Sequence, residues 1–314
     1  MDPEYFRSDM CWGTLGTVRP HSNFHPDRDV ELLLLALEKK DSATLVRILT
    51  NRNNDQRQIL AKTFEDLTQK ELGAALKKGL SGDLERLLLE LMMPPLQYEA
   101  YRLQEAMAGV GTDEESLLEI LCTRTGPELK QISSIYRHMY KKELEKELRS
   151  ETSGDFAKLI VALLNKEDVA GLVHKDAETL LQTLNGKKCD AGLWIEILTS
   201  RDPDHLRKVL DEVEYQSGLF LEEAFDKRFS GDLRLGLKVL VQCLQNPDLY
   251  LAKRINTMKV PLTQRVMVSH CEEDLLSIRA AFIKHTGTSL YSALQNHFKG
   301  DLLVALLNIC RSED

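Results

Sequence analysis

Apolar residues recur along this chain at helical spacing, and nowhere do they alternate with polar residues as they would in a half-buried strand. Some segments are short and apolar, such as Leu45–Leu49 and Leu117–Leu121. Others are longer, charged and amphipathic, such as Glu128–Tyr140, and a third kind is almost wholly apolar, such as Phe156–Leu164. The pattern predicts short helices throughout and therefore an all-α fold.

Two short elements recur in the same order and indicate internal repeats. The first ends in a basic residue, at Arg52, Arg124, Arg201 and His270. The second is a turn around a glycine, usually Ser-Gly-Asp, at Gly82, Gly154, Gly231 and Gly300. Each basic residue precedes the glycine of its turn by 30 positions (52 to 82, 124 to 154, 201 to 231, 270 to 300). Four equal spacings predict four repeats of about 70 residues, each with five helices.

Short breaks separate the predicted repeats, at Pro94-Pro95, at Asn165–Lys175 and at Asn246-Pro247. We therefore predict a tail at residues 1–23 and repeats at residues 24–94, 95–164, 165–245 with its linker, and 246–314. The aspartate that follows each turn glycine suits a helix N-terminus, both as a capping residue and as a charge near the helix dipole.

Composition and charge narrow the function. The 314 residues carry a net charge of −8, so bulk charge does not favour a polyanion, and we expect no nucleic-acid partner. Contact with an anionic membrane would need something to bridge the like charges. Six cysteines without CxxC pairs, and a Met1–Pro20 segment without an apolar stretch, predict a reduced, cytoplasmic protein. Apolar runs such as Leu32–Leu37 are too short to span a bilayer.

One stretch, Met107–Glu115, holds the candidate chemistry. Gly109 and Gly111 stand one residue apart between two predicted helices, and their backbone freedom lets the loop turn its carbonyl oxygens outward. Outward carbonyls beside a carboxylate suit calcium. Thr112 and Glu115 have the spacing of a capping box, which predicts that the next helix begins at Thr112. A glycine-rich turn between helices is also a common plain connector, and that alternative stays open for the loop alone.

Four five-helix repeats with Gly-x-Gly-Thr before the second helix resemble the annexin family. The marks of the resemblance are Gly109–Glu114, Ile120–Thr125, Glu151–Asp155, Val266–Ser269, Asp274–Arg279 and Ala305–Cys310. Asn23-Phe24, Arg28-Asp29 and Trp194-Ile195 look most like the annexin-two branch of vertebrates. The resemblance implies four repeats packed in a curved disc, with calcium loops on its convex face. It also implies peripheral, calcium-dependent binding to anionic phospholipid membranes.

In the annexin family, calcium is held by main-chain oxygens of a Met-x-Gly-x-Gly loop and by an acid forty residues beyond the second glycine. The second repeat matches this pattern: Met107, Gly109 and Gly111 would offer carbonyl oxygens, and Glu151 a bidentate carboxylate. Calcium takes about 6–8 oxygens, so positions remain for water or a lipid phosphate. One carboxylate leaves the ion positive, which predicts weak affinity without lipid, on the order of 10⁻⁴–10⁻³ M.

In the same register, the other three loops depart from the pattern. The first repeat, 72 positions earlier, has Leu35, Leu37, Lys39 and Lys40, with Gly79 in place of the acid. The third, 77 positions later, has Leu184, Gly186, Lys188 and Cys189, with Arg228 in place of the acid. The fourth has no Gly-x-Gly around Thr257–Leu262, gains Pro261, and places His297 at the acid position. We therefore predict one intact site and reduced calcium sensitivity.

The alternative is a calcium-independent membrane or protein scaffold that uses basic residues of the degenerate loops, namely Lys39, Lys40, Lys187, Lys188 and Arg228. These residues can equally be ordinary solvated cations. No nucleophile elbow, P-loop or Rossmann motif occurs, so we predict that the protein is not an enzyme. His270-Cys271 hints at zinc but has no spaced partner in the sequence. Met1–Trp12 lacks the amphipathic helix by which annexin-two-like proteins engage EF-hand partners, so we do not expect that mode of partner binding, and other protein partners stay unknown.

Overall fold

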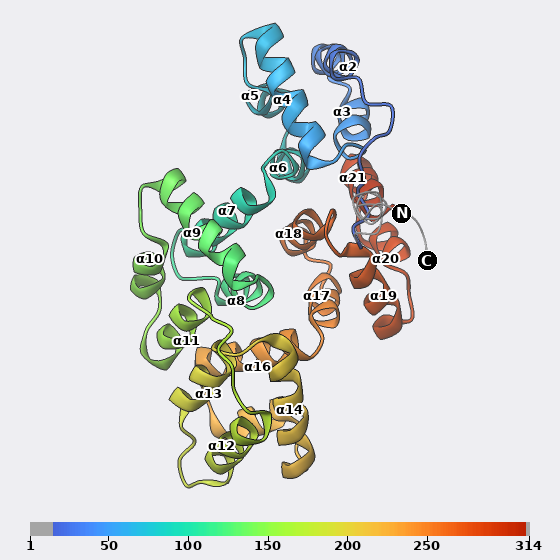
Figure 1. Cartoon of the computed structure of the whole chain (residues 1–314). Coiled ribbons are helices and arrows are strands. Elements are labelled where there is room, and N and C mark those ends of the chain that lie inside the picture. The colour runs from blue at the N-terminus through green and yellow to red at the C-terminus, as the bar shows by residue number, and fades with distance from the viewer. Residues whose placement is uncertain (1–14, 312–314) are drawn as a thin grey trace, which may run out of the picture. The chain divides into compact units, whose positions relative to one another are not determined.

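The computed structural model describes residues 15–311, and every regular element in that range is an α-helix (Figure 1). The absence of strands between residues 15 and 311 confirms the predicted all-α fold. The prediction about Met1–Trp12 concerns residues outside this range.

The helices follow one another as four repeats of five. The first repeat comprises α2 (Pro26–Lys39), α3 (Ser42–Leu49), α4 (Asn54–Thr68), α5 (Leu72–Gly79) and α6 (Gly82–Leu91). The second comprises α7 (Pro95–Met107), α8 (Glu114–Thr123), α9 (Gly126–Tyr140), α10 (Leu144–Glu151) and α11 (Gly154–Leu164). The third comprises α12 (Val173–Asn185), α13 (Ala191–Thr199), α14 (Pro203–Ser217), α15 (Leu221–Arg228) and α16 (Gly231–Gln245). The fourth comprises α17 (Pro247–Ile255), α18 (Val260–His270), α19 (Leu275–Thr286), α20 (Leu290–His297) and α21 (Gly300–Cys310).

The chain divides into two compact units, and each unit combines two repeats. Of the described residues, unit 1 contains 15–98 and 251–311, so the first and fourth repeats pack together although they are far apart in sequence. Within it, α21 lies beside α3 (Figure 1), and the Asn308 amide donates to the Thr50 hydroxyl at 3.1 Å. Unit 2 spans Glu99–Tyr250 and contains the second and third repeats, including the candidate calcium loop.

The recurring arginine has a structural role that its position explains. It follows the second helix of its repeat and pairs with an acid on the first helix, in Arg52–Asp29 (2.7 Å), Arg124–Glu99 (3.2 Å) and Arg201–Asp176 (2.8 Å). The first pair is buried, with 8% of the Arg52 side chain and 9% of the Asp29 side chain exposed. In the fourth repeat His270 takes the place of the arginine, and its Nδ1 lies 2.6 Å from an Asp274 oxygen.

The glycine turn begins the last helix of each repeat, as predicted. Its glycine has a left-handed backbone, with φ of +65°, +61°, +60° and +65° at Gly82, Gly154, Gly231 and Gly300. The following aspartate lies in the first turn of the helix and is not the N-cap residue, so the expectation that it caps the helix is wrong. Its carboxylate remains near the positive end of the helix dipole, which is the other expected contribution.

The described end of the predicted tail is held against the fourth repeat. The amides of Thr17 and Val18 donate to the Cys271 carbonyl at 2.7 and 2.9 Å, and the Leu15 carbonyl accepts from the Leu276 amide at 2.7 Å. A Cβ on Gly16 would lie 2.4 Å from a backbone carbon of Glu272, so only glycine fits there. Residues 15–18 are therefore part of unit 1.

We predict that Asp29→Ala lowers the free energy of unfolding by about 3–5 kcal/mol, because it leaves the buried Arg52 charge without its carboxylate. Asp27→Ala is the matched control, since Asp27 is exposed on the same helix and should cost less than about 1 kcal/mol. Urea unfolding followed by circular dichroism measures both. Equal costs for the two variants would show that the buried pair has no special weight.

Candidate metal centre

The loop between α7 and α8, residues 108–113, has the backbone geometry that its glycines predict. Gly109 and Gly111 adopt φ of +93° and +86°, in the region that side-chain-bearing residues rarely enter. A Cβ on either glycine would meet no atom within 4 Å, so the constraint is backbone conformation and not space. Val110 between them is fully exposed at the loop tip, whereas Met107, the last residue of α7, is buried.

Glu151 reaches this loop although it is forty residues beyond Gly111 in sequence. It is the last residue of α10, and the Thr112 hydroxyl donates to its Oε2 at 3.2 Å and lies 3.4 Å from its main-chain oxygen. Glu151 is exposed, and it forms no ion pair with a cation anywhere in residues 15–311. The structure thus brings together a loop with two left-handed glycines and an exposed carboxylate.

Two carboxylates of α10, those of Glu147 and Glu151, act on the nearby hydroxyl of Tyr136. Burial raises the pKa of the Tyr136 hydroxyl, and the carboxylates of Glu147 and Glu151 raise it further because they disfavour a phenolate nearby. Tyr136 remains a neutral donor and hydrogen-bonds the Gln104 side chain.

The predicted N-cap residue of α8 is wrong by one position. Asp113, not Thr112, is the N-cap residue: its Oδ1 accepts from the Ser116 amide at 3.1 Å, and its Oδ2 from the Ser116 hydroxyl at 2.7 Å. The Thr112 hydroxyl is instead directed to Glu151.

In the first repeat the loop has been replaced by helix. α2 continues to Lys39, and only Lys40, with φ +55°, and Asp41 separate it from α3. The Asp41 amide donates to Ala36 at 2.8 Å, as the Asp113 amide donates to Ala106 at 2.8 Å.

This shared hydrogen bond corrects the register of the first repeat. Asp41 corresponds to Asp113 at 72 positions, but Ala36 corresponds to Ala106 at 70, so the first loop is shorter by two residues. The counterpart of Met107 is therefore Leu37 and not Leu35. The two-residue difference is not visible in the sequence, because a single offset of 72 positions aligns α3 with α8 and no motif marks the end of α2.

The fourth repeat also lacks the loop. Residues 256–259 join α17 to α18, Met258 carries a φ of +52°, and Pro261 lies in the first turn of α18. His297, at the acid position, uses its Nδ1 to contact the Ala293 carbonyl of its own helix at 2.9 Å.

The third repeat keeps the register through its loop, and there the structure shows an interaction that the sequence did not predict. Arg228, at the acid position, donates from Nη2 to the Gly186 carbonyl and to the Thr183 carbonyl, the latter at 3.3 Å. Gly186 does not share the left-handed backbone of its counterpart Gly109, since its φ is −73°.

The structure also shows a second group of possible metal ligands, which was not predicted from the sequence. His270, Glu273 and Asp274 place one ligand atom each within 4.8 Å of one another, at the end of α18. The partners of His270 are thus three and four residues ahead, a helical spacing that the sequence does contain, and the statement that it lacks a spaced partner is wrong. Cys271 does not join them: its thiol donates to the Val268 carbonyl at 3.3 Å, and burial raises its pKa to about 12.

Comparison with known proteins decides the family. The annexin family model matches residues 28–91, 98–163, 175–240 and 258–309, and each match falls within one repeat of five helices. The chain belongs to the annexin family. Mouse annexin A9 is 38% identical over 319 residues, which cover 97% of this chain and 92% of that protein.

Solved annexin structures share the fold. This annexin superimposes on annexin III with a TM-score of 0.92 at 36% identity, covering 95% of this chain and 98% of that one. A chicken annexin V structure, a complex with Zn²⁺, gives a TM-score of 0.89 at 37% identity over 96% of this chain and 99% of that one. The narrower resemblance to the annexin-two branch stays a prediction.

Family membership gives a general mode of action. Annexins are generally non-enzymatic proteins that bind phospholipid membranes peripherally and in a calcium-dependent manner. In this annexin, no helix between residues 15 and 311 combines the length and apolar character that a bilayer crossing requires.

We predict that Asp113→Ala lowers the free energy of unfolding by about 1 kcal/mol, because α8 loses its N-cap acceptor. Thr112→Ala should cost less than about 0.5 kcal/mol, since its hydroxyl caps nothing and its partner is exposed. Denaturation in calcium-free buffer compares the two. A larger cost for Thr112→Ala than for Asp113→Ala would reverse the assignment of the cap.

Proposed function

We propose that this annexin binds anionic phospholipid membranes in a calcium-dependent manner through one site in its second repeat. The ligands would be the carbonyl oxygens of Met107, Gly109 and Gly111 and the carboxylate of Glu151. The observation that supports this most is the contact between Thr112 and Glu151, because it brings the only predicted acid ligand to the glycine loop across forty residues.

The chemistry of this donor set suits calcium and a lipid together. Three carbonyls and a bidentate carboxylate leave one or more of calcium's roughly 6–8 oxygen positions open. A lipid phosphate can supply both the missing oxygen and the negative charge that a single carboxylate does not. Calcium then bridges a protein of net charge −8 to an anionic surface, because it adds positive charge where the two meet.

A single site implies reduced calcium sensitivity compared with an annexin in which all four loops bind. The short α2–α3 connection and the Arg228 contact in the third repeat support this part of the proposal. The exposed Val110 would meet the interface between headgroups and acyl chains when the loop docks. We propose that the protein is cytoplasmic and associates with membranes when calcium rises.

We predict that Glu151→Gln raises the calcium concentration needed for half-maximal vesicle binding by about tenfold or more, because the ion loses its only charged ligand. The assay is sedimentation with vesicles of equimolar phosphatidylserine and phosphatidylcholine across a calcium titration.

Glu147→Gln is the matched control. It removes one charge from the same helix, and Glu147 pairs with Lys142 at 2.9 Å and has no contact with the Thr112 hydroxyl. Its calcium titration should follow that of the wild type. If Glu151→Gln and Glu147→Gln both pellet like the wild type, the second repeat is not the calcium site.

A further inference from the structure

In the third repeat a side chain stands where the second repeat is proposed to hold a metal ion. Arg228 corresponds to Glu151, and Gly186 corresponds to Gly109, both at 77 positions. The Arg228 Nη2 donates to the Gly186 carbonyl, so a guanidinium satisfies the counterpart of a proposed calcium ligand. A second bond from the same nitrogen to the Thr183 carbonyl, at 3.3 Å, ties α15 to the end of α12.

Thr183, the second acceptor of Arg228, is buried, and its side chain is hydrogen-bonded. Thr183 is 7% exposed, and its hydroxyl accepts from the Trp194 indole at 2.7 Å while donating to the Leu180 carbonyl at 2.7 Å. A Cβ on Gly186 would lie 3.3 Å from the Lys188 carbonyl, so the loop folds back closely on itself. These contacts hold the loop without a metal ion, because the guanidinium of Arg228 bonds the loop carbonyls directly.

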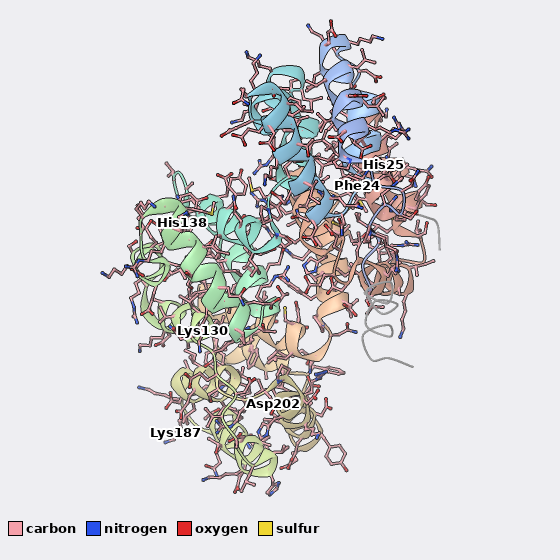
Figure 2. All side chains as sticks on the ribbon, turned by 45° about the horizontal axis from the view of Figure 1, so that its top comes forward. Phe24, His25, Lys130, His138, Lys187 and Asp202 are labelled. Atoms are coloured by element: carbon pink, nitrogen blue, oxygen red, sulfur yellow. The ribbon has the colours of Figure 1, made fainter. Side chains whose placement is uncertain are left out.

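Arg228 contacts the loop from its own helix, α15, and the loop itself carries two further cations, Lys187 and Lys188. Lys187 and Lys188 are exposed, and neither has an ion-pair partner within residues 15–311. Figure 2 shows Lys187 at the outer edge of the ribbon, at the end of α12. The nearest acid along the chain, Asp190, is engaged as the N-cap of α13, where it accepts from the Gly192 amide at 2.8 Å.

We infer that the third repeat is a calcium-independent contact for anionic phospholipid, in which Arg228 organises the loop from within and Lys187 and Lys188 face the headgroups. A lipid surface fits this loop better than a single bound anion does, because two exposed neighbouring lysines at a protruding tip enclose nothing. Such cations gain from the summed charge of many headgroups. Calcium is excluded from this loop because Arg228 repels it and already occupies the Gly186 carbonyl.

The two repeats would then divide the work of membrane binding within unit 2. The second repeat responds to calcium through Glu151, and the third supplies a constant attraction that depends on lipid charge and ionic strength. This inference does not rest on the calcium site, since its lysines and its arginine act in the absence of calcium.

The test is sedimentation in EGTA at low salt with vesicles of equimolar phosphatidylserine and phosphatidylcholine. Wild-type protein should pellet, and pelleting should disappear at about 1 M salt, where the Debye length falls to about 3 Å. The double variant K187E/K188E should bind at least about tenfold more weakly, because near an anionic membrane each reversed charge turns attraction into repulsion.

K175E/K208E is the matched control, with the same change of charge on two exposed lysines of the same repeat. Lys175 lies near the start of α12, at the other end of that helix from the loop. Its binding in EGTA should stay within about threefold of the wild type. All four lysines are exposed, so both double variants should fold, and thermal unfolding checks this.

Arg228→Gln adds a test of the inner cation. It should weaken binding in EGTA by about fivefold through loss of one charge near the surface, and Arg228→Lys should keep most of the affinity. These variants are compared in EGTA, where no calcium site can contribute, so this inference and the calcium proposal fail separately. Absence of wild-type pelleting in EGTA, equal pelleting on pure phosphatidylcholine, or equal effects of the two lysine pairs would overturn the inference.

Discussion

The approach of one carboxylate to one loop is the constraint on which the proposed calcium-dependent function of this annexin depends. Glu151 lies at the end of α10 and touches Thr112, whereas the two glycines with left-handed backbones lie just before it in the loop. Neither part binds calcium well alone, because the loop carries no charge and the carboxylate offers too few oxygens. The helices of the second repeat bring these parts together before any ion arrives.

The same position carries four different residues in the four repeats, and each has a distinct physical consequence. Glu151 leaves a free carboxylate, Arg228 donates to loop carbonyls, His297 bonds its own helix, and Gly79 offers no side chain at all. The loops have changed in parallel with these residues, most clearly in the first repeat, where α2 runs through the former loop. One framework therefore carries the proposed metal site in the second repeat and, in the third, an arginine bonded to loop carbonyls.

Much of the fold could be predicted because its signals are local or periodic. Helical spacing and the constant 30-residue interval were sufficient for the helices and the four repeats. The Asp29–Arg52 pair was not predictable, since the two residues lie on different elements and no local pattern joins them. The bond from Arg228 to the Gly186 carbonyl likewise joins segments that meet only in the folded chain.

Diffraction from calcium-soaked crystals, read at a wavelength where calcium scatters anomalously, tests the central claim most directly. We expect one ion in the second repeat, about 2.3–2.6 Å from the carbonyl oxygens of Met107, Gly109 and Gly111 and from both oxygens of Glu151. We also expect no ion beside Arg228. Calcium bound in the third repeat, with the second repeat empty at the same concentration, would contradict the account.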